Sequence, residues 1–179
     1  YVTDSVRQLV KDSGYPGMKV LEFAFDSRDS GGAEDYLPHN YEKNSVVYTG
    51  THDNETVTGW FTAGLKPEEK EAVRDYFCDH TTPDAGMYMP LVCAAMRSVS
   101  RLCIIPMQDL LGLGNEARMN TPSTYGNNWK WRLLKDEFGE KEVKTLYEIT
   151  KRYGRIGKMR KEEGSCRNGV LPVKRTVNN

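Results

Sequence analysis

Three short apolar runs, far apart in the chain, constrain most strongly how this sequence can fold. They are MKVLEFAF (18–25), SVVYTG (45–50) and RLCIIPM (101–107). Runs of this length that are apolar almost throughout are typical of strands buried on both faces, as in parallel sheets. They predict three parallel strands, each connected to the next by a crossover segment.

Amphipathic patterns predict helices before, between and after these runs, over 2–13, 67–77, 87–99 and 138–153. Strands that alternate with helices indicate an α/β fold. Residues 26–45 are polar, contain Gly31-Gly32 and are expected to form a long loop. A sheet of three strands buries little by itself, so we expect further strands outside this chain or from a partner.

The composition excludes several classes of protein. The 179 residues suit one domain, and the balanced charge, +0 at pH 7, argues against a nucleic-acid partner. The mean hydropathy of −0.65 and the absence of a long apolar run argue against a membrane partner. The four cysteines form no CxxC pair. They favour reduced core thiols and a cytoplasmic location over a disulfide framework or a zinc site.

Polar side chains follow each predicted strand. The first run leads into Asp26, Arg28 and Asp29, the second into THDNE (51–55), and the third into Gln108-Asp109. Functional groups of parallel α/β proteins gather at this end of the strands. His52 and Asp53 enter one pocket only if the strand ends there and bends, which Gly50 permits. A carboxylate beside a histidine suits oxocarbenium chemistry on sugars, although a capped loop explains the spacing equally well.

Several longer segments resemble one enzyme family. They are PGMKVLEFAF, YLPHNY (36–41), VVYTGTHDNETVTGWF (46–61), PMQDLLGLGNEARMNTP (106–122) and NNWKWRL (127–133). Together they resemble the amylomaltases, the 4-α-glucanotransferases of glycoside hydrolase family 77. The resemblance implies the last three βα units of a (β/α)8 barrel in residues 1–155, with 156–179 as a poorly ordered tail. It implies malto-oligosaccharides and α-1,4-glucans as substrates and no cofactor.

The resemblance also assigns roles to individual residues. Asp53 matches the carboxylate that stabilises the transition state, and His52 and Asn54 lie in the same sugar-binding motif. Further substrate-binding candidates are Asn120 and Pro122, in the loop after the last strand, together with His39 and Trp60.

The chain departs from the family pattern at two loops and in a larger respect. Glu34-Asp35 and Pro122-Ser123-Thr124 replace the usual residues of two motifs. The nucleophile and the acid/base glutamate of the family would both precede Tyr1. The chain is therefore expected to hold one of the three catalytic carboxylates, to be inactive alone, and to self-associate through an open sheet edge.

Other interpretations remain open. A metal-dependent hydrolase would use His39, His52 and Asp109, and a non-catalytic glucan-binding or scaffold fragment would need no further carboxylate. Glu22, inside an apolar run, is either a paired structural carboxyl or a catalytic one. Asp109 is either a loop cap or a catalytic group. The Trp129/Trp131 pair either packs or stacks on sugar. Glu55 is expected to be structural, and His80 is expected to be exposed.

Overall fold

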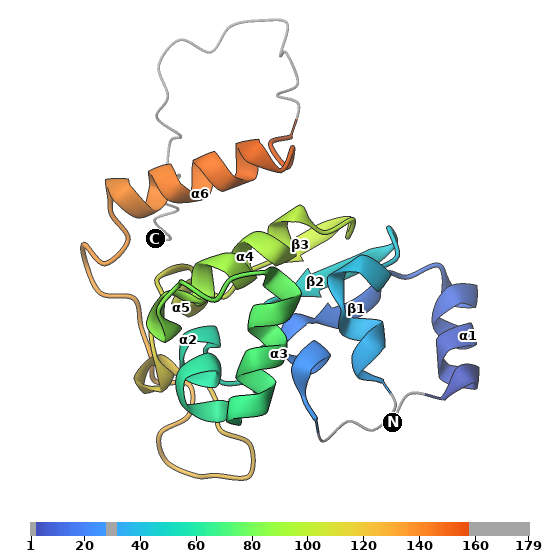
Figure 1. Cartoon of the computed structure of the whole chain (residues 1–179), viewed down its shortest axis with the longest axis horizontal. Coiled ribbons are helices and arrows are strands. Elements are labelled where there is room, and N and C mark those ends of the chain that lie inside the picture. Colours follow the sequence, from blue (N-terminus) through green and yellow to red (C-terminus); the bar gives the residue numbers. More distant parts are fainter. Residues whose placement is uncertain (1–2, 28–31, 158–179) are drawn as a thin grey trace, which may run out of the picture.

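The computed structural model describes residues 3–27 and 32–157. Its centre is a parallel sheet in the order β1-β2-β3, formed by Gly17–Val20, Ser45–Tyr48 and Leu102–Ile104 (Figure 1). Met18 pairs with Val46, and Val46 with Leu102. The α-helices are α1 (Asp4–Ser13), α2 (Val57–Gly59), α3 (Pro67–Phe77), α4 (Tyr88–Arg97), α5 (Met107–Leu110) and α6 (Glu140–Arg152). None of the described helices is both long and apolar enough to cross a membrane.

The α/β alternation and the parallel strands confirm the class of fold predicted from the sequence. The four predicted helices correspond to α1, α3, α4 and α6, with small shifts at their ends. Helix α1 stops at Gly14, whose positive φ of 69° closes the last turn with a hydrogen bond to the Lys11 carbonyl. The predicted tail beyond residue 157, with Cys166, lies outside the described residues, as do Arg28 and Asp29.

The first predicted strand was wrong in its length. Only Gly17–Val20 is extended, and Leu21–Phe25 continues as a 3₁₀ helix. A strand would send alternate side chains to opposite faces. The tighter helix instead buries Leu21, Glu22 and Ala24. It also lets Phe25 pack edge-on against Tyr76, with ring centroids 5.5 Å apart.

Two regions in which the sequence predicted no helix contain short helices in the structure. The predicted loop 26–45 contains the 3₁₀ helices Ala33–Tyr36 and Pro38–Asn40. After β2 the chain forms α2, capped by the Thr56 side chain, and then a π-helix over Trp60–Gly64. These turns place Val57 and Phe61 in the core, each with no exposed surface.

The two faces of the sheet differ sharply in exposure. One face carries Val47, fully buried against Ala95 of α4. The register puts Met18, Leu102 and Ile104 on the other face, where they are 55%, 50% and 40% exposed. Apolar side chains on a parallel sheet are normally covered on both faces. Among the described residues nothing covers this face around these three side chains, although Val20 on the same face is only 1% exposed.

Helix α4 is the centre of the packing. It contributes Leu91 and Ala94 to a core with α2 and α3, and Val92 and Met96 to a contact with Ile149 of α6. Arg155, which follows α6, connects this part of the chain to α4 by donating a hydrogen bond to the Met96 carbonyl at 2.6 Å. Helix α1 stands apart at one end of the molecule and buries no side chain (Figure 1).

The cysteine prediction was partly wrong. Cys78, Cys93 and Cys103 are free, as expected, but only Cys93 and Cys103 are even partly buried. Cys78 is exposed and follows the last residue of α3 in the left-handed conformation, with φ 52°. Burial raises the pKa of the Cys103 thiol to about 11, so this thiol stays protonated at neutral pH.

Candidate active site at the ends of the strands

A cavity of about 370 Å³ opens where the carboxyl ends of the three strands meet the uncovered sheet face. Met18, Tyr48 and Ile104 form its apolar wall. Its polar wall comes from the segment after β2 and the segment after β3, including His52, Asn54, Glu55, Gln108, Asp109 and Arg118. The volume and the mixed lining suit a small polar ligand such as a sugar ring.

A tight turn over Thr51–Asn54 carries the polar residues that follow β2. The Asn54 side chain accepts hydrogen bonds from the Thr51 amide at 3.0 Å and from its hydroxyl at 2.6 Å. The Asp53 amide donates to the same Thr51 hydroxyl oxygen at 3.3 Å. The chain therefore bends directly after the strand, as the adjacent placement of His52 and Asp53 requires.

The segment after β3 clamps this turn through Arg118 and Asn120. The Asn120 amide donates to the His52 carbonyl at 3.1 Å, and its side chain donates to Asp53 Oδ1 at 2.6 Å. Arg118 donates to the carbonyls of Asp53 and Asn120, each at 2.8 Å. Two segments far apart in the sequence thus hold one constellation.

His52 and Asp53 lie next to each other and remain accessible. The distance between His52 Nε2 and Asp53 Oδ1 is 3.4 Å, and each side chain is about half exposed. The ring of Trp129 lies 5.1 Å from the His52 ring, centroid to centroid. Trp129 has a positive φ of 65°, a conformation that is unusual for a bulky residue, and its amide donates to the Met119 carbonyl. Trp129 thus packs against His52 with part of its ring, while about half of its surface remains exposed.

Two buried carboxyl groups, those of Glu22 and Asp109, lie close to this turn. Glu22 is 4% exposed and Asp109 is 1% exposed. Asp109 accepts hydrogen bonds from the Thr49 hydroxyl at 2.5 Å and from the Val57 amide at 2.8 Å, so it caps the start of α2. Of the two roles left open for Asp109, the structure therefore shows the cap. Burial raises the pKa of Asp109, and these two hydrogen bonds work against the rise.

The structure brings some predicted residues together and leaves others apart. His52 and Asn54 line the cavity, whereas Asp53 and Asn120 are absent from its wall and are joined to each other beside His52. His39 lies elsewhere and hydrogen-bonds the Tyr76 hydroxyl at 2.9 Å. Trp60 is 9% exposed within the core, where it supports the fold below the site and does not line it. Pro122 lies on an exposed loop and is absent from the cavity wall.

Arg118 and the Thr51 hydroxyl also belong to the site, and neither was predicted from the sequence. Arg118 was one basic residue in a loop, and nothing in its spacing indicated that it would bridge to the turn after another strand. Its guanidinium also lies 3.7 Å from Glu55 Oε1, and both side chains line the cavity. A basic side chain among strand-end carboxyl groups is the signal that could have identified it.

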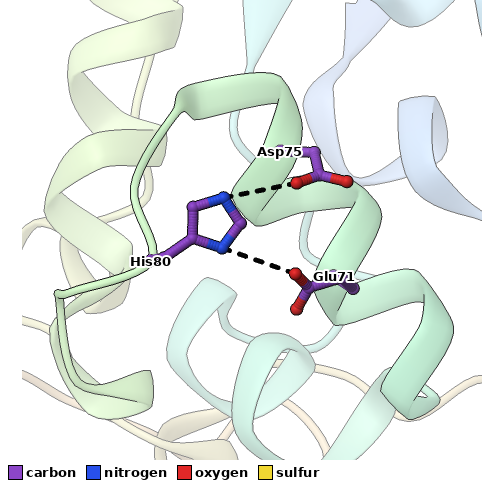
Figure 2. A group of neighbouring side chains, drawn as sticks. All are labelled: Glu71, Asp75 and His80. Carbon is purple, nitrogen blue, oxygen red and sulfur yellow. Dashed lines mark ion pairs between the residues drawn. The ribbon is translucent and has the colours of Figure 1, made fainter.

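The metal ligands that a hydrolase would use do not come together in this structure. Within residues 3–27 and 32–157, no group that could hold a metal ion contains His39, His52 or Asp109. The search of these residues instead finds Glu71, Asp75 and His80, all exposed, at the end of α3. In Figure 2 the two ring nitrogens of His80 face different carboxylates, Nδ1 toward Glu71 at 3.4 Å and Nε2 toward Asp75 at 3.2 Å. Exposed acidic groups of this kind are common without a metal ion, and the two ion pairs of His80 account for the arrangement.

Comparison with known proteins decides the family. Residues 1–136 match the family model described as 4-alpha-glucanotransferase. The chain belongs to the 4-alpha-glucanotransferase family. It is 44% identical over 155 residues to the 4-alpha-glucanotransferase of Clostridium butyricum. It is also 44% identical over 158 residues to the chloroplastic/amyloplastic enzyme of Solanum tuberosum.

A solved structure agrees with these sequence matches. The amylomaltase from Streptococcus agalactiae in complex with acarbose superposes with a TM-score of 0.76 at 37% identity, over 86% of this chain. The chain covers 30% of that protein, 31% of the Clostridium butyricum enzyme and 26% of the Solanum tuberosum enzyme. This member of the 4-alpha-glucanotransferase family thus spans less than a third of the relatives that it matches.

Proposed function

We propose that this chain forms part of a 4-α-glucanotransferase that moves α-1,4-glucan segments between malto-oligosaccharides. The observation that carries the proposal is the constellation of His52, Asp53 and Asn120 in a member of this family, in which His52 lines a strand-end cavity and the other two residues lie beside it. The binding of acarbose by the amylomaltase from Streptococcus agalactiae supports a glucan-like ligand for this protein.

Asp53 is the proposed transition-state stabiliser. Its carboxylate is half exposed toward solvent and is oriented by the Asn120 side chain at 2.6 Å. A fixed carboxylate favours the positive charge that develops on the sugar ring as the glycosidic bond breaks. His52, held between Asp53 and Trp129, is placed to donate a hydrogen bond to a sugar hydroxyl.

The nucleophile and the acid/base group of the retaining double displacement are proposed to come from outside residues 1–179. Retaining enzymes place two such carboxyl groups about 5–5.5 Å apart. The uncovered sheet face with Met18, Leu102 and Ile104 supports the same idea, because the inner side chains of a (β/α)8 barrel are covered only when the ring closes. We therefore propose that β1, β2 and β3 are the last three strands of such a barrel.

The location and partners follow from the same proposal. A cytoplasmic location fits the free cysteines, whereas the potato relative is described as chloroplastic/amyloplastic. Self-association of the isolated chain through the edges of β1 or β3 is proposed because unpaired strand edges invite pairing. Sedimentation velocity of the 179-residue chain tests this, and a monomer at all concentrations would contradict it.

A hybrid enzyme tests the function directly. In it, residues 1–155 of this chain replace the matching segment of the Streptococcus agalactiae amylomaltase, which supplies the rest of the protein. We expect the hybrid to convert maltotriose into glucose and longer oligosaccharides. A folded hybrid that binds maltotriose without transferring glucosyl units would contradict the transferase proposal and favour a glucan-binding scaffold.

The isolated chain is the matched control for the hybrid. Asp53 cannot alone form a glycosyl-enzyme and also protonate the leaving oxygen, so the chain is expected to leave maltotriose unchanged. Disproportionation at ordinary enzyme rates by the purified chain would show that its own carboxyl groups suffice. Glu22 and Asp109 would then be the first candidates for the two missing roles.

A further inference from the structure

Trp129 combines an exposed side chain with an unfavourable backbone conformation. The residue is 52% exposed, and its φ of 65° lies in the left-handed region. In that region the Cβ atom of an L residue comes too close to the following carbonyl oxygen, so glycine and asparagine adopt it at lower cost. Burial of the indole ring would offset this cost, but about half of the residue remains exposed. Packing alone therefore does not explain a tryptophan at this position.

The backbone of Trp129 is fixed by hydrogen bonds on both sides. Its amide donates to the Met119 carbonyl at 2.7 Å, and its carbonyl accepts from Arg132 Nη1 at 2.9 Å. The preceding residue, Asn128, is also held, because its side-chain oxygen accepts from the Thr121 amide at 2.9 Å. The loop therefore imposes the left-handed conformation and presents the indole ring from a fixed position.

The indole ring lies directly beside the proposed catalytic turn. Its centroid is 5.1 Å from that of the His52 ring, and the two ring planes are tilted by 40°. His52 lines the strand-end cavity and lies 3.4 Å from Asp53, whereas Trp129 is absent from the cavity wall. Trp129 thus adds an exposed aromatic surface next to the residues proposed to hold the reacting sugar ring.

An exposed indole beside a sugar site suits one kind of ligand surface in particular. The C–H groups of a glucosyl ring form an apolar face with a slight positive charge, and the face of an aromatic ring is apolar and slightly negative. Stacking of the two surfaces removes apolar area from water on both sides. In a malto-oligosaccharide the next glucosyl unit is joined covalently to the one at the turn, so it lies within reach of a neighbouring aromatic ring.

We propose that Trp129 is a substrate-binding residue whose open indole surface stacks on the glucosyl unit adjacent to the one held by His52 and Asp53. This role rests on the proposed function and names a second binding position for the same glucan. Trp129 then contributes to the affinity for oligosaccharides, whereas Asp53 contributes to the chemical step.

Nuclear magnetic resonance of the 179-residue chain, titrated with maltoheptaose, tests the proposal without any need for activity. The indole N–H signal of Trp129 should shift together with the backbone amides of His52 and Asp53. Trp129→Ala should weaken the binding of maltoheptaose about 3- to 10-fold, the usual contribution of one aromatic contact. Trp129→Phe, which keeps an aromatic ring, should retain most of the affinity.

A pair of variants separates binding from stability. Trp129→Ala and Trp129→Gly both remove the ring, but only glycine relieves the unfavourable φ. The glycine variant should therefore unfold at a higher urea concentration than the alanine variant, while both bind maltoheptaose equally weakly. If Trp129 acted only through the stability of the loop, affinity would follow stability and the glycine variant would bind more tightly.

Tyr125 provides a matched control, because it is a fully exposed aromatic residue of the same loop. Tyr125→Ala should leave the affinity for maltoheptaose unchanged. In the hybrid enzyme, Trp129→Ala should raise KM for maltoheptaose by the same factor as it weakens binding and leave kcat close to native.

Three results would overturn the proposal. The first is a Trp129 indole signal that does not move when maltoheptaose is added. The second is native affinity in Trp129→Ala, and the third is an affinity that follows stability across the alanine and glycine variants. Failure of the hybrid to transfer glucosyl units, with the indole signal still shifting, would count against the proposed function and not against this binding role.

Discussion

In the part of the chain that the structure describes, two groups combine a histidine with carboxylates, and they differ in their surroundings. His52 and Asp53 sit on a turn after β2, close to two buried carboxyl groups, and are clamped by Arg118 and Asn120. His80 bridges Glu71 and Asp75 on the exposed surface of α3. The residue types are nearly the same. What distinguishes the first group is the cavity beside it and the set of contacts that fixes its orientation.

Replacement of Asp53 should have the largest effect. In the hybrid enzyme, Asp53→Asn keeps the shape of the side chain and removes the charge that acts as the oxocarbenium ion develops. We expect kcat to fall about 10²–10³-fold with little change in KM, because the lost interaction is made in the transition state. Glucose release from maltotriose measures this. A change of a fewfold would make Asp53 an ordinary loop carboxylate.

Replacement of Arg118 should have the next largest effect. Arg118→Met keeps the aliphatic stem but removes the hydrogen bonds to the carbonyls of Asp53 and Asn120. Hydrogen bonds that involve a charged group are worth about 1.5–3 kcal/mol each, so the free energy of unfolding should fall by roughly 2 kcal/mol. Urea unfolding of this chain measures it. Equal stability of variant and native chain would show that the clamp contributes nothing.

The pH dependence of stability should sharpen the comparison between buried and exposed carboxyl groups. Because the pKa of Glu22 is raised in the folded state, the folded chain loses stability as the pH rises from the unfolded value through the folded one. Glu22→Gln lacks this loss, so its advantage in unfolding free energy should grow with pH. Urea unfolding at several pH values measures the difference.

Glu69→Gln should behave in the opposite way. The lowered pKa of Glu69 means that its contribution to stability is present above the unfolded value and is lost as the pH falls. The native chain should therefore exceed this variant most at neutral pH and least in acid. Parallel pH trends for the two glutamine variants would contradict both assignments.

The smallest effect is expected at the exposed group. His80→Ala or Asp75→Asn should change the free energy of unfolding by about 0.5 kcal/mol or less, because exposed ion pairs contribute little. In the hybrid enzyme these variants should transfer glucosyl units at the native rate. Thermal unfolding and the maltotriose assay measure the two quantities. A loss near that of Asp53→Asn would erase the distinction between the two groups.

The comparison also explains which features the sequence could predict. Apolar runs and helical patterns depend on burial that repeats along the chain, so the parallel strands and α1, α3, α4 and α6 were predictable. The polar residues after β2 were predictable for a related reason, since functional groups gather at strand ends. The 3₁₀ helix Leu21–Phe25 was not, because its apolar letters suit a strand equally well.

The contacts that orient the site residues could not be predicted from the sequence, for a different physical reason. Arg118 meets Asp53 across 65 positions, and Asn120 meets it across 67. No local pattern specifies such a pairing, because it depends on how the segments after β2 and β3 are brought together. The position of His39 could not be predicted for the same reason. Its hydrogen-bond partner, Tyr76, lies on α3, and His39 does not line the cavity.

The most direct test of the account is a crystal structure of the hybrid enzyme with acarbose, the ligand present in the Streptococcus agalactiae structure. We expect a sugar ring in the strand-end cavity, with His52 and Asp53 within hydrogen-bond distance of its hydroxyl groups and Glu71, Asp75 and His80 free of ligand. Acarbose bound elsewhere, with the cavity between His52 and Arg118 empty, would contradict the claim that this turn forms the glucan site.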